Sequence, residues 1–153
     1  MTNKPEFSIR HQTEHDQSYI LNTWLMNFRC SNHLERMIRH NVYFEEQTHL
    51  IQKILTKSKV IVAVDLEHDS QIFGYLVYNE VAHTKIIHYV YVKSPFRRLG
   101  IATALKDFVF GNVDDDDGKY PILTTHYTRM SPLLNIKWNL TFNPYLLLDI
   151  YSE

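Results

Sequence analysis

The feature that most constrains this chain is a strand that runs into a helix through a glycine-containing turn at residues 87–105. Residues 90–92 (Val-Tyr-Val) have strand character, and residues 97–102 (Arg-Arg-Leu-Gly-Ile-Ala) lead into apolar positions at helical spacing. The first amides of a helix lack partners, and the helix dipole adds roughly +0.5 charge there. Small residues at this point let an anion approach, and the two arginines add cationic donors. The segment therefore predicts an anion-binding site.

Length and composition fit one globular domain. The chain has 153 residues, of which 44% are hydrophobic and 22% charged, whereas a disordered chain would be less apolar and more charged. A length of about 150 residues is typical of one domain, so we expect a single domain over residues 1–153. The formal net charge of −1 excludes a strongly basic nucleic-acid coat but not a local basic site.

The numbers and spacing of cysteine and histidine residues limit which cellular compartment and which metal sites are expected. The single cysteine, Cys30, excludes an internal disulfide and a thiolate-based metal cluster, and it suits a reducing cytoplasm. The polar residues 1–10 lack the core of a signal peptide, and the aliphatic runs are too short to span a membrane. His11 and His15 are four residues apart, but their segment is not helical, so we expect no metal site.

Local patterns predict an α+β fold with an antiparallel meander followed by helical crossovers. Strands are predicted at residues 7–11, 59–66, 72–78, 84–92, 121–127 and 141–150, with a bend or edge position at Pro144. Helices are predicted after Asp16, over 34–55, over 100–109 and from Ser131 to about Trp138. The second helical region contains Leu34, Met37 and Ile38, followed by Leu50, Ile51 and Leu55.

The segment 87–105 resembles the GNAT superfamily of acyl-CoA-dependent N-acetyltransferases. Their signature, Arg/Gln-x-x-Gly-x-Gly/Ala after the fourth strand, falls on Arg97, Gly100 and Ala102, and Phe96 matches the aromatic residue before the arginine. The order of strands and helices agrees over nearly the whole chain. The resemblance implies a mixed α/β GNAT-like fold. Its central twisted sheet would be mostly antiparallel, with six or seven strands flanked by about four helices.

The resemblance also implies acetyl-CoA as the cofactor. The turn and the first helical turn would hold the coenzyme A pyrophosphate, and the strand end would hold the pantetheine arm. These roles fall on Tyr91, Val92, Arg97, Arg98, Leu99, Gly100, Ile101, Ala102 and Thr103. The amide of Val90 would polarise the acyl carbonyl, which is oxyanion-type stabilisation. An amine would attack the thioester directly, without a covalent enzyme intermediate.

Direct attack needs a base for the amine proton, and His88 is the first candidate because imidazole titrates near neutral pH. Many members carry a carboxylate at this strand position. Alternation along the strand places the His88 side chain on the same face as Val90 and Val92. The simpler interpretation is a half-buried histidine with a structural hydrogen bond, and His126 in the next strand is a second candidate base.

The acid that would protonate the departing thiolate is less clear from the sequence. Many members use a tyrosine in or just after the penultimate helix, but residues 133–142 contain none. Lys137 is the candidate in that neighbourhood, with Tyr127, Tyr145 or water as alternatives, and a thiol of pKa about 8.5 leaves without strong help. The missing tyrosine leaves open a catalytically inactive structural or regulatory module.

The acceptor is expected to be a primary amine of a small molecule or a protein. The net charge argues against a nucleic-acid acceptor, although several cations are available for a basic surface: Lys57, Lys59, Lys85, Arg97, Arg98, Arg129 and Lys137. The run Asp114–Asp117 could attract a cationic amine, but an exposed solvated loop is the simpler interpretation. Dimers joined through the last strands are common among proteins of this family, so the resemblance also implies a homodimer.

Overall fold

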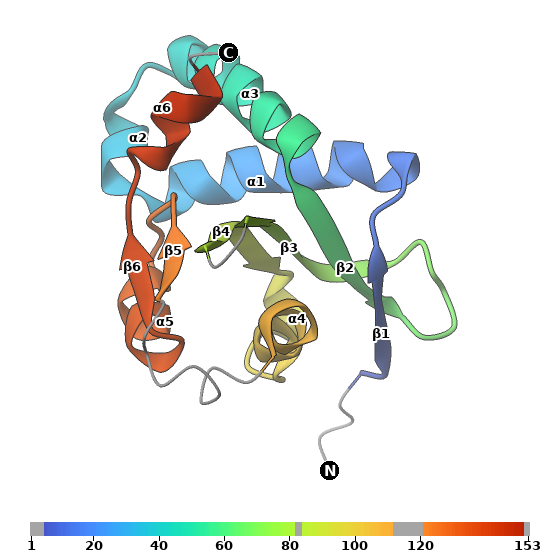
Figure 1. Ribbon diagram of the computed structural model, residues 1–153. Helices are drawn as coiled ribbons and strands as arrows, with labels where there is room; N and C mark the ends of the chain where they lie inside the picture. Colours follow the sequence, from blue (N-terminus) through green and yellow to red (C-terminus); the bar gives the residue numbers. More distant parts are fainter. Residues whose placement is uncertain (1–4, 82–83, 112–120, 152–153) are drawn as a thin grey trace.

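Helices cover both faces of a six-stranded sheet in the computed structural model, which describes residues 5–81, 84–111 and 121–151 (Figure 1). The strands follow one another across the sheet in chain order: β1 (Phe7–His11), β2 (Lys59–Asp65), β3 (Ile72–Val81), β4 (Thr84–Val92), β5 (Ile122–Thr124) and β6 (Leu140–Phe142). The α-helices are α1 (Gln17–Ser31), α2 (His33–Met37), α3 (His40–Lys57), α4 (Ile101–Phe110), α5 (Ser131–Lys137) and α6 (Leu146–Tyr151). Two short 3₁₀ turns, η1 (Glu14–Asp16) and η2 (Ser94–Phe96), precede α1 and α4.

The sheet is mixed, which corrects the prediction of a mostly antiparallel sheet. Strands β1 to β4 form an antiparallel meander, but β4 pairs with β5, and β5 with β6, in parallel. The reason is that α4 and α5 each carry the chain back to the starting end of the sheet before the next strand begins. The described residues contain six α-helices rather than about four, because the second helical region divides into α2 and α3 and the chain ends in α6.

The C-terminal residues correct a second prediction. Only two residues of the expected strand, Thr141 and Phe142, belong to β6, and α6 takes the place of its second half. Pro144 lies in the turn between them, where its carbonyl accepts from the amide of Leu147 at 3.1 Å. Asn143 supports the same turn, because its side-chain oxygen accepts from the amide of Tyr145 at 3.1 Å. Proline cannot donate to a ladder but suits the start of a helix, so the expected bend is present and the strand ends there.

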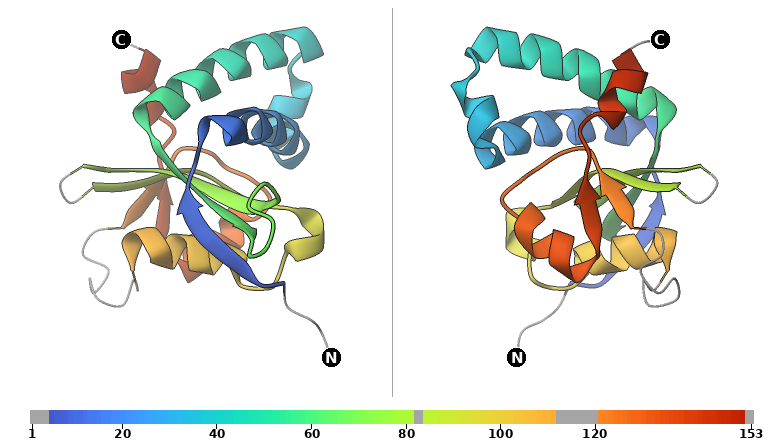
Figure 2. Two further views of the ribbon diagram at one scale, coloured as in Figure 1. Left: turned by 90° about the vertical axis from the view of Figure 1, so that its right-hand side faces the viewer. Right: turned by 60° about the vertical axis from the view of Figure 1, so that its left-hand side comes forward.

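Each face of the sheet carries its own apolar core, as alternation along the strands requires. Val60, Val62 and Val64 of β2 pack against α1 and α3, whereas Ile61 and Ala63 pack on the side of α4. Figure 2 shows the two helical layers on opposite sides of the sheet.

A β-bulge at His88 interrupts the pairing of β3 with β4. Its neighbours Ile87 and Tyr89 lie opposite Tyr78 and Val77, which are adjacent, so His88 is the extra residue. Tyr89 packs in the core beneath α1, whereas Ile87 packs on the side of α4. The bulge therefore shifts the alternation of β4 at this position.

Candidate active site

The turn before α4 has the backbone conformation that its glycine allows. Gly100 immediately precedes the helix with φ of 84°, in the left-handed region that favours glycine. Nothing lies within 4 Å of the position that a side chain would take there. Arg98 also has a positive φ, of 65°. Two left-handed residues in three positions turn the chain sharply from β4 into α4, with the space in front of the helix left open.

The first amides of α4 are available for an anion. The helical hydrogen bonds begin with the amide of Ala104, which donates to the carbonyl of Gly100 at 2.9 Å. The amides of Ile101, Ala102 and Thr103 therefore have no partner within the helix, as at any helix start. The side chain of Ile101 is buried and fixes the helix on the sheet. The described site thus brings together the predicted cofactor-loop residues around a rigid helix start.

Aromatic and backbone contacts anchor the connection that leads into this turn. Phe96 stacks on Phe73 of β3 with ring centroids 4.0 Å apart, and the amide of Lys93 donates to the carbonyl of Phe73 at 2.7 Å. Arg97 reaches back, and its Nε donates to the carbonyl of Val92 at 2.8 Å. That bond uses one of the five guanidinium donors. The Arg97 side chain is thereby held at the junction of β4 and the helix start.

Strand β4 extends beyond the end of its parallel neighbour β5. The backbone of residues 89–92, on the side away from β3, is therefore an open edge of the sheet. Pairing of β4 with β5 covers only Ile86 and Ile87, whereas β4 continues to Val92. The amide of Lys93 points to β3, and successive amides of a strand point to opposite sides. The backbone groups of Val90 and Val92 therefore point to the open edge, as the Arg97 bond to the Val92 carbonyl also indicates.

His88, the predicted base, is buried with both ring nitrogens in hydrogen bonds. Nδ1 lies 3.0 Å from Thr125 Oγ1, and Nε2 lies 3.1 Å from the Asn79 amide. With its oxygen toward His88, Asn79 accepts from Nε2 and donates to the carbonyls of Lys57 at 2.9 Å and Tyr78 at 3.2 Å. Nε2 then carries the proton, and Nδ1 accepts from the threonine hydroxyl. Burial lowers the pKa of His88 to about 4, so the ring is neutral at pH 7.

The bulge overturns the expected facing of His88. Its partner Asn79 also accepts at 3.2 Å from the hydroxyl of Ser58, the residue that follows α3. Val90 and Val92 instead pack against the core on the side of α4. His88 therefore points to the other side of the sheet from these two valines, because the extra residue of a bulge breaks simple alternation.

The second candidate base belongs to the same hydrogen-bonded chain. His126 Nδ1 lies 2.9 Å from Thr125 Oγ1, so Thr125 bridges the two histidines. The His126 ring packs edge-on against Trp24 and Phe28 of α1, with centroids 5.2 and 4.9 Å away. Burial lowers the pKa of His126 to about 3. The sequence pattern singled out both histidines but not Thr125 or Asn79, because a bridging side chain leaves no periodic signal.

The candidate acids are not part of the hydrogen-bonded chain of His88, Thr125 and His126. Lys137 is exposed in the last turn of α5, and Tyr145 is also exposed. Tyr127 packs edge-on against Phe142 with centroids 5.5 Å apart. In the described ranges, none of these side chains makes a hydrogen bond with His88. The run Asp114–Asp117 lies outside the described residues.

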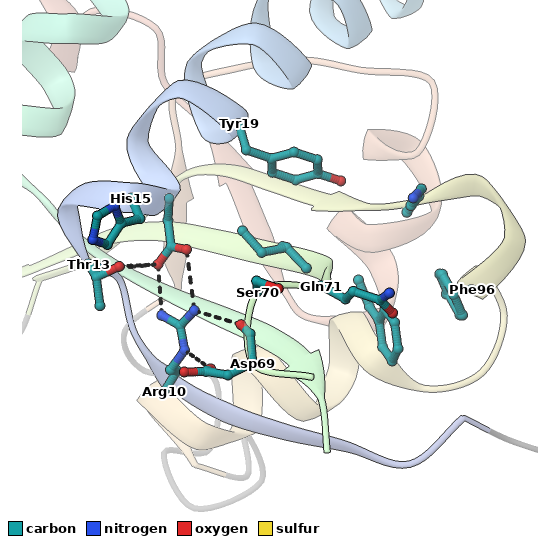
Figure 3. A pocket seen from close by; sticks show the side chains of 12 residues that line it. Arg10, Thr13, His15, Tyr19, Asp69, Ser70, Gln71 and Phe96 are labelled. Atoms are coloured by element: carbon teal, nitrogen blue, oxygen red, sulfur yellow. Dashed lines mark hydrogen bonds and ion pairs between the residues drawn. The ribbon is translucent and has the colours of Figure 1, made fainter. Parts of the chain in front are cut away.

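A cavity of about 710 Å³ lies beside the connection between β4 and α4, on the side of β1 and α1 (Figure 3). Arg10 closes one end of the cavity. Its Nη1 and Nη2 donate to the Asp16 carboxylate at 2.7 and 3.2 Å, and its Nε donates to the Asp69 carboxylate at 2.5 Å. Nη1 and Nη2 also donate to the carbonyls of His11 and Asp69, both at 3.0 Å. Burial raises the pKa of Asp16, but the bonds from Arg10 and the amide of Thr13 outweigh it and hold that pKa below its usual value. Asp16, the predicted cap of α1, thus serves in a clamp between β1, α1 and the β2–β3 turn.

Comparisons with known proteins agree with this architecture. The family model described as "Acetyltransferase (GNAT) family" matches residues 21–123. A protein of Pyrococcus furiosus assigned to the acetyltransferases is 21% identical, with 88% of this chain and 89% of that chain covered and a TM-score of 0.60. A protein of Clostridium difficile 630 assigned to the same class is 15% identical, with 87% of each chain covered and a TM-score of 0.54. At these identities the two structures show the fold alone. The comparison with curated proteins gives no match.

Proposed function

Because the chain belongs to the GNAT family of acetyltransferases, we propose that it transfers an acetyl group from acetyl-CoA to a primary amine of its acceptor. The observation that carries the proposal is the open helix start of α4 directly beside the open edge of β4. Unpaired amides at a helix start suit a pyrophosphate. The open strand edge suits an amide-containing arm, which can pair with it as another strand would.

The residues of this chain would divide the work as follows. The amides of Ile101 to Thr103 hold the pyrophosphate, and Arg97 and Arg98 add positive charge beside it. The backbone of Val92 holds the arm, and the amide of Val90 donates to the acyl oxygen as negative charge develops on it. When bound, acetyl-CoA supplies an activated thioester.

The transfer itself is a direct displacement. The amine nitrogen forms a bond to the acyl carbon, the carbon–sulfur bond breaks, and the amine proton passes to a base while the thiolate gains a proton. His88 is our proposed base, and it can take a proton at Nδ1 only after the Thr125 hydroxyl turns away from that nitrogen. Lys137 is the proposed acid for the thiolate.

Calorimetric titration and thiol release together test this proposal. The wild-type chain should bind acetyl-CoA and release free thiol when a suitable amine is added, whereas Arg97→Glu should lose binding. His88→Gln should keep binding and lose turnover. Full turnover in His88→Gln would remove the histidine from the mechanism, and absence of acetyl-CoA binding in the folded wild type would overturn the proposal as a whole.

A catalytically inactive module is the second candidate. The observation that favours it is that both nitrogens of His88 are already occupied in a buried site. That candidate predicts a folded chain that releases no thiol with any amine, even at saturating acetyl-CoA.

A further inference from the structure

The apolar stripe of Leu34, Met37 and Ile38, which opens the second predicted helical region, faces solvent. Leu34 and Met37 of α2 are 69% and 71% exposed, and Ile38, which follows the helix in extended conformation, is exposed as well. Val42, in the first turn of α3, is also exposed. The physical reason is that α2 has only five residues and buries none of them. Clustered exposed apolar side chains of this kind mark interaction sites more often than isolated ones do.

Polar contacts, rather than apolar burial, hold α2 in place. The Asn32 side chain accepts from the amide of Glu35 at 3.2 Å and donates to the carbonyl of Tyr127 at 3.0 Å. Arg29 Nη2 donates to the carbonyl of Ile38 at 2.9 Å, and its guanidinium lies over the Tyr43 ring, 4.9 Å from the centroid. The inner side of α2 is thereby fixed, while its apolar side chains remain available outside.

The same surface carries two exposed arginines. Arg36 and Arg39 are exposed beside the stripe, together with His33 and His40. Glu35 of α2 is half-buried and lies within 3.5 Å of the Gln47 amide, and the exposed Glu45 and Glu46 follow Val42 within about one turn of α3. The positive charge therefore lies at the α2 end of this surface, and the carboxylates lie at its α3 end. We call residues Leu34, Arg36, Met37, Ile38, Arg39 and Val42 the α2 surface.

The α2 surface borders the candidate active site. Figure 1 shows α2 at the end of the sheet where β5 finishes. The Asn32 bond to Tyr127 joins α2 to the segment after β5, and Arg129 Nη2 donates to the carbonyl of Cys30 at 2.9 Å. Tyr127 directly follows His126, which is joined to His88 through Thr125. A molecule bound on α2 would therefore lie on the β5 side of the open edge of β4.

We propose that the α2 surface docks an acidic and apolar segment of a protein, so that the amine acetylated belongs to that protein. This inference rests on the proposed function. Exposed arginines complement carboxylates, and the leucine, methionine and isoleucine side chains gain from apolar partners. A nucleic acid would make little use of four aliphatic side chains, and two exposed arginines neutralise few phosphates. An acidic, apolar peptide matches the arginines and the apolar exposure together.

Labelled peptides with a single lysine test the proposal, by fluorescence anisotropy and by acetylation kinetics. One peptide flanks the lysine with Asp, Glu and Leu, and a matched peptide replaces the acids with Gln. The wild type should prefer the acidic peptide by roughly tenfold in KM, a typical worth for two charge-assisted contacts. The double variant Arg36→Glu/Arg39→Glu should abolish that preference with kcat unchanged, and Leu34→Ser/Met37→Ser should weaken both peptides.

Matched controls separate docking from folding and from chemistry. Leu66→Ser changes a leucine of similar exposure (57%) in the β2–β3 turn, and Lys59→Glu reverses an exposed charge on β2. Both controls should leave the peptide preference intact, and all variants should acetylate a small amine equally. Equal binding of both peptides, or salt-dependent binding of single-stranded RNA in place of peptides, would overturn the docking inference. Peptide binding that depends on Arg36 in a chain without turnover would support docking and refute the proposed function instead.

Discussion

Acidification should unfold this protein through its two buried histidines. In the unfolded chain a histidine has a pKa of about 6.5. Burial lowers the pKa of His88 to about 4 and that of His126 to about 3 in the folded state. Above pH 6.5 the two histidines are neutral in both the folded and the unfolded state, so they do not change the free energy of unfolding. Below pH 6.5 the unfolded state binds more protons than the folded state, and stability falls as the pH falls.

The size of the loss follows from these pKa values. Each histidine removes nearly 1.4 kcal/mol of unfolding free energy per pH unit once the pH is well below 6.5. Between pH 7 and pH 5, one histidine accounts for about 2 kcal/mol and the pair for about 4 kcal/mol. That is a large part of the 5–15 kcal/mol that stabilises a typical domain. The loss should continue toward pH 4, where His88 begins to gain a proton in the folded state.

Urea unfolding at pH 7, 6 and 5 measures this dependence directly. His88→Gln removes one titrating group and keeps a side chain that can bond to Thr125 and Asn79, so it should reduce the loss to about 2 kcal/mol. His49→Gln changes an exposed histidine on α3 and should leave the loss unchanged. A wild-type stability that stays within about 1 kcal/mol between pH 7 and 5 would refute the buried neutral pair.

Three further predictions address the clamp, the strand register and the sheet edge. Arg10→Ala leaves the buried Asp16 without its partner and should cost about 3–5 kcal/mol in urea unfolding, with Arg10→Lys recovering part of it. In Gly74→Ala the new methyl carbon would meet the carbonyl oxygen of Tyr91 at 2.5 Å, so unfolding should be easier by about 1–3 kcal/mol and acetyl-CoA should bind more weakly in titration. β6 is an edge strand flanked by exposed apolar side chains, so the chain should sediment as a dimer, and Thr141→Lys should sediment as a monomer.

The part of the fold that depends on local chemistry could be predicted from the sequence. Strand β4 has the predicted bounds. The glycine turn, the start of α4 and the antiparallel meander of the earlier strands also follow from residue types and spacing. The conformation of the turn before α4 was therefore predictable, because the glycine and the helix start decide it, and the cofactor-binding role of its residues stays a prediction. Periodicity identifies such elements since neighbouring residues alone decide them.

The remainder depended on contacts between distant residues. A bulge at His88 cannot be inferred from one strand, because the extra residue is defined only by the partner strand. The stripe beginning at Leu34 is apolar at helical spacing, but no element of the described residues covers these side chains. The C-terminal helix stands where a strand was predicted, because Leu146 and its neighbours are apolar without a periodicity that distinguishes a helix from a strand.

Among the described residues, no helix has both the length and the apolar character that a membrane span requires.

Thermal unfolding with and without acetyl-CoA tests the central claim most directly. Ligand at about 100 times its dissociation constant should add about 2.7 kcal/mol, which is roughly 5–10 °C for a domain of this size. The Arg97→Glu variant should lose this shift, whereas Arg36→Glu, an equal charge reversal on α2, should keep it. A folded wild-type protein whose unfolding temperature ignores acetyl-CoA, or an Arg97→Glu variant with an undiminished shift, would contradict the account.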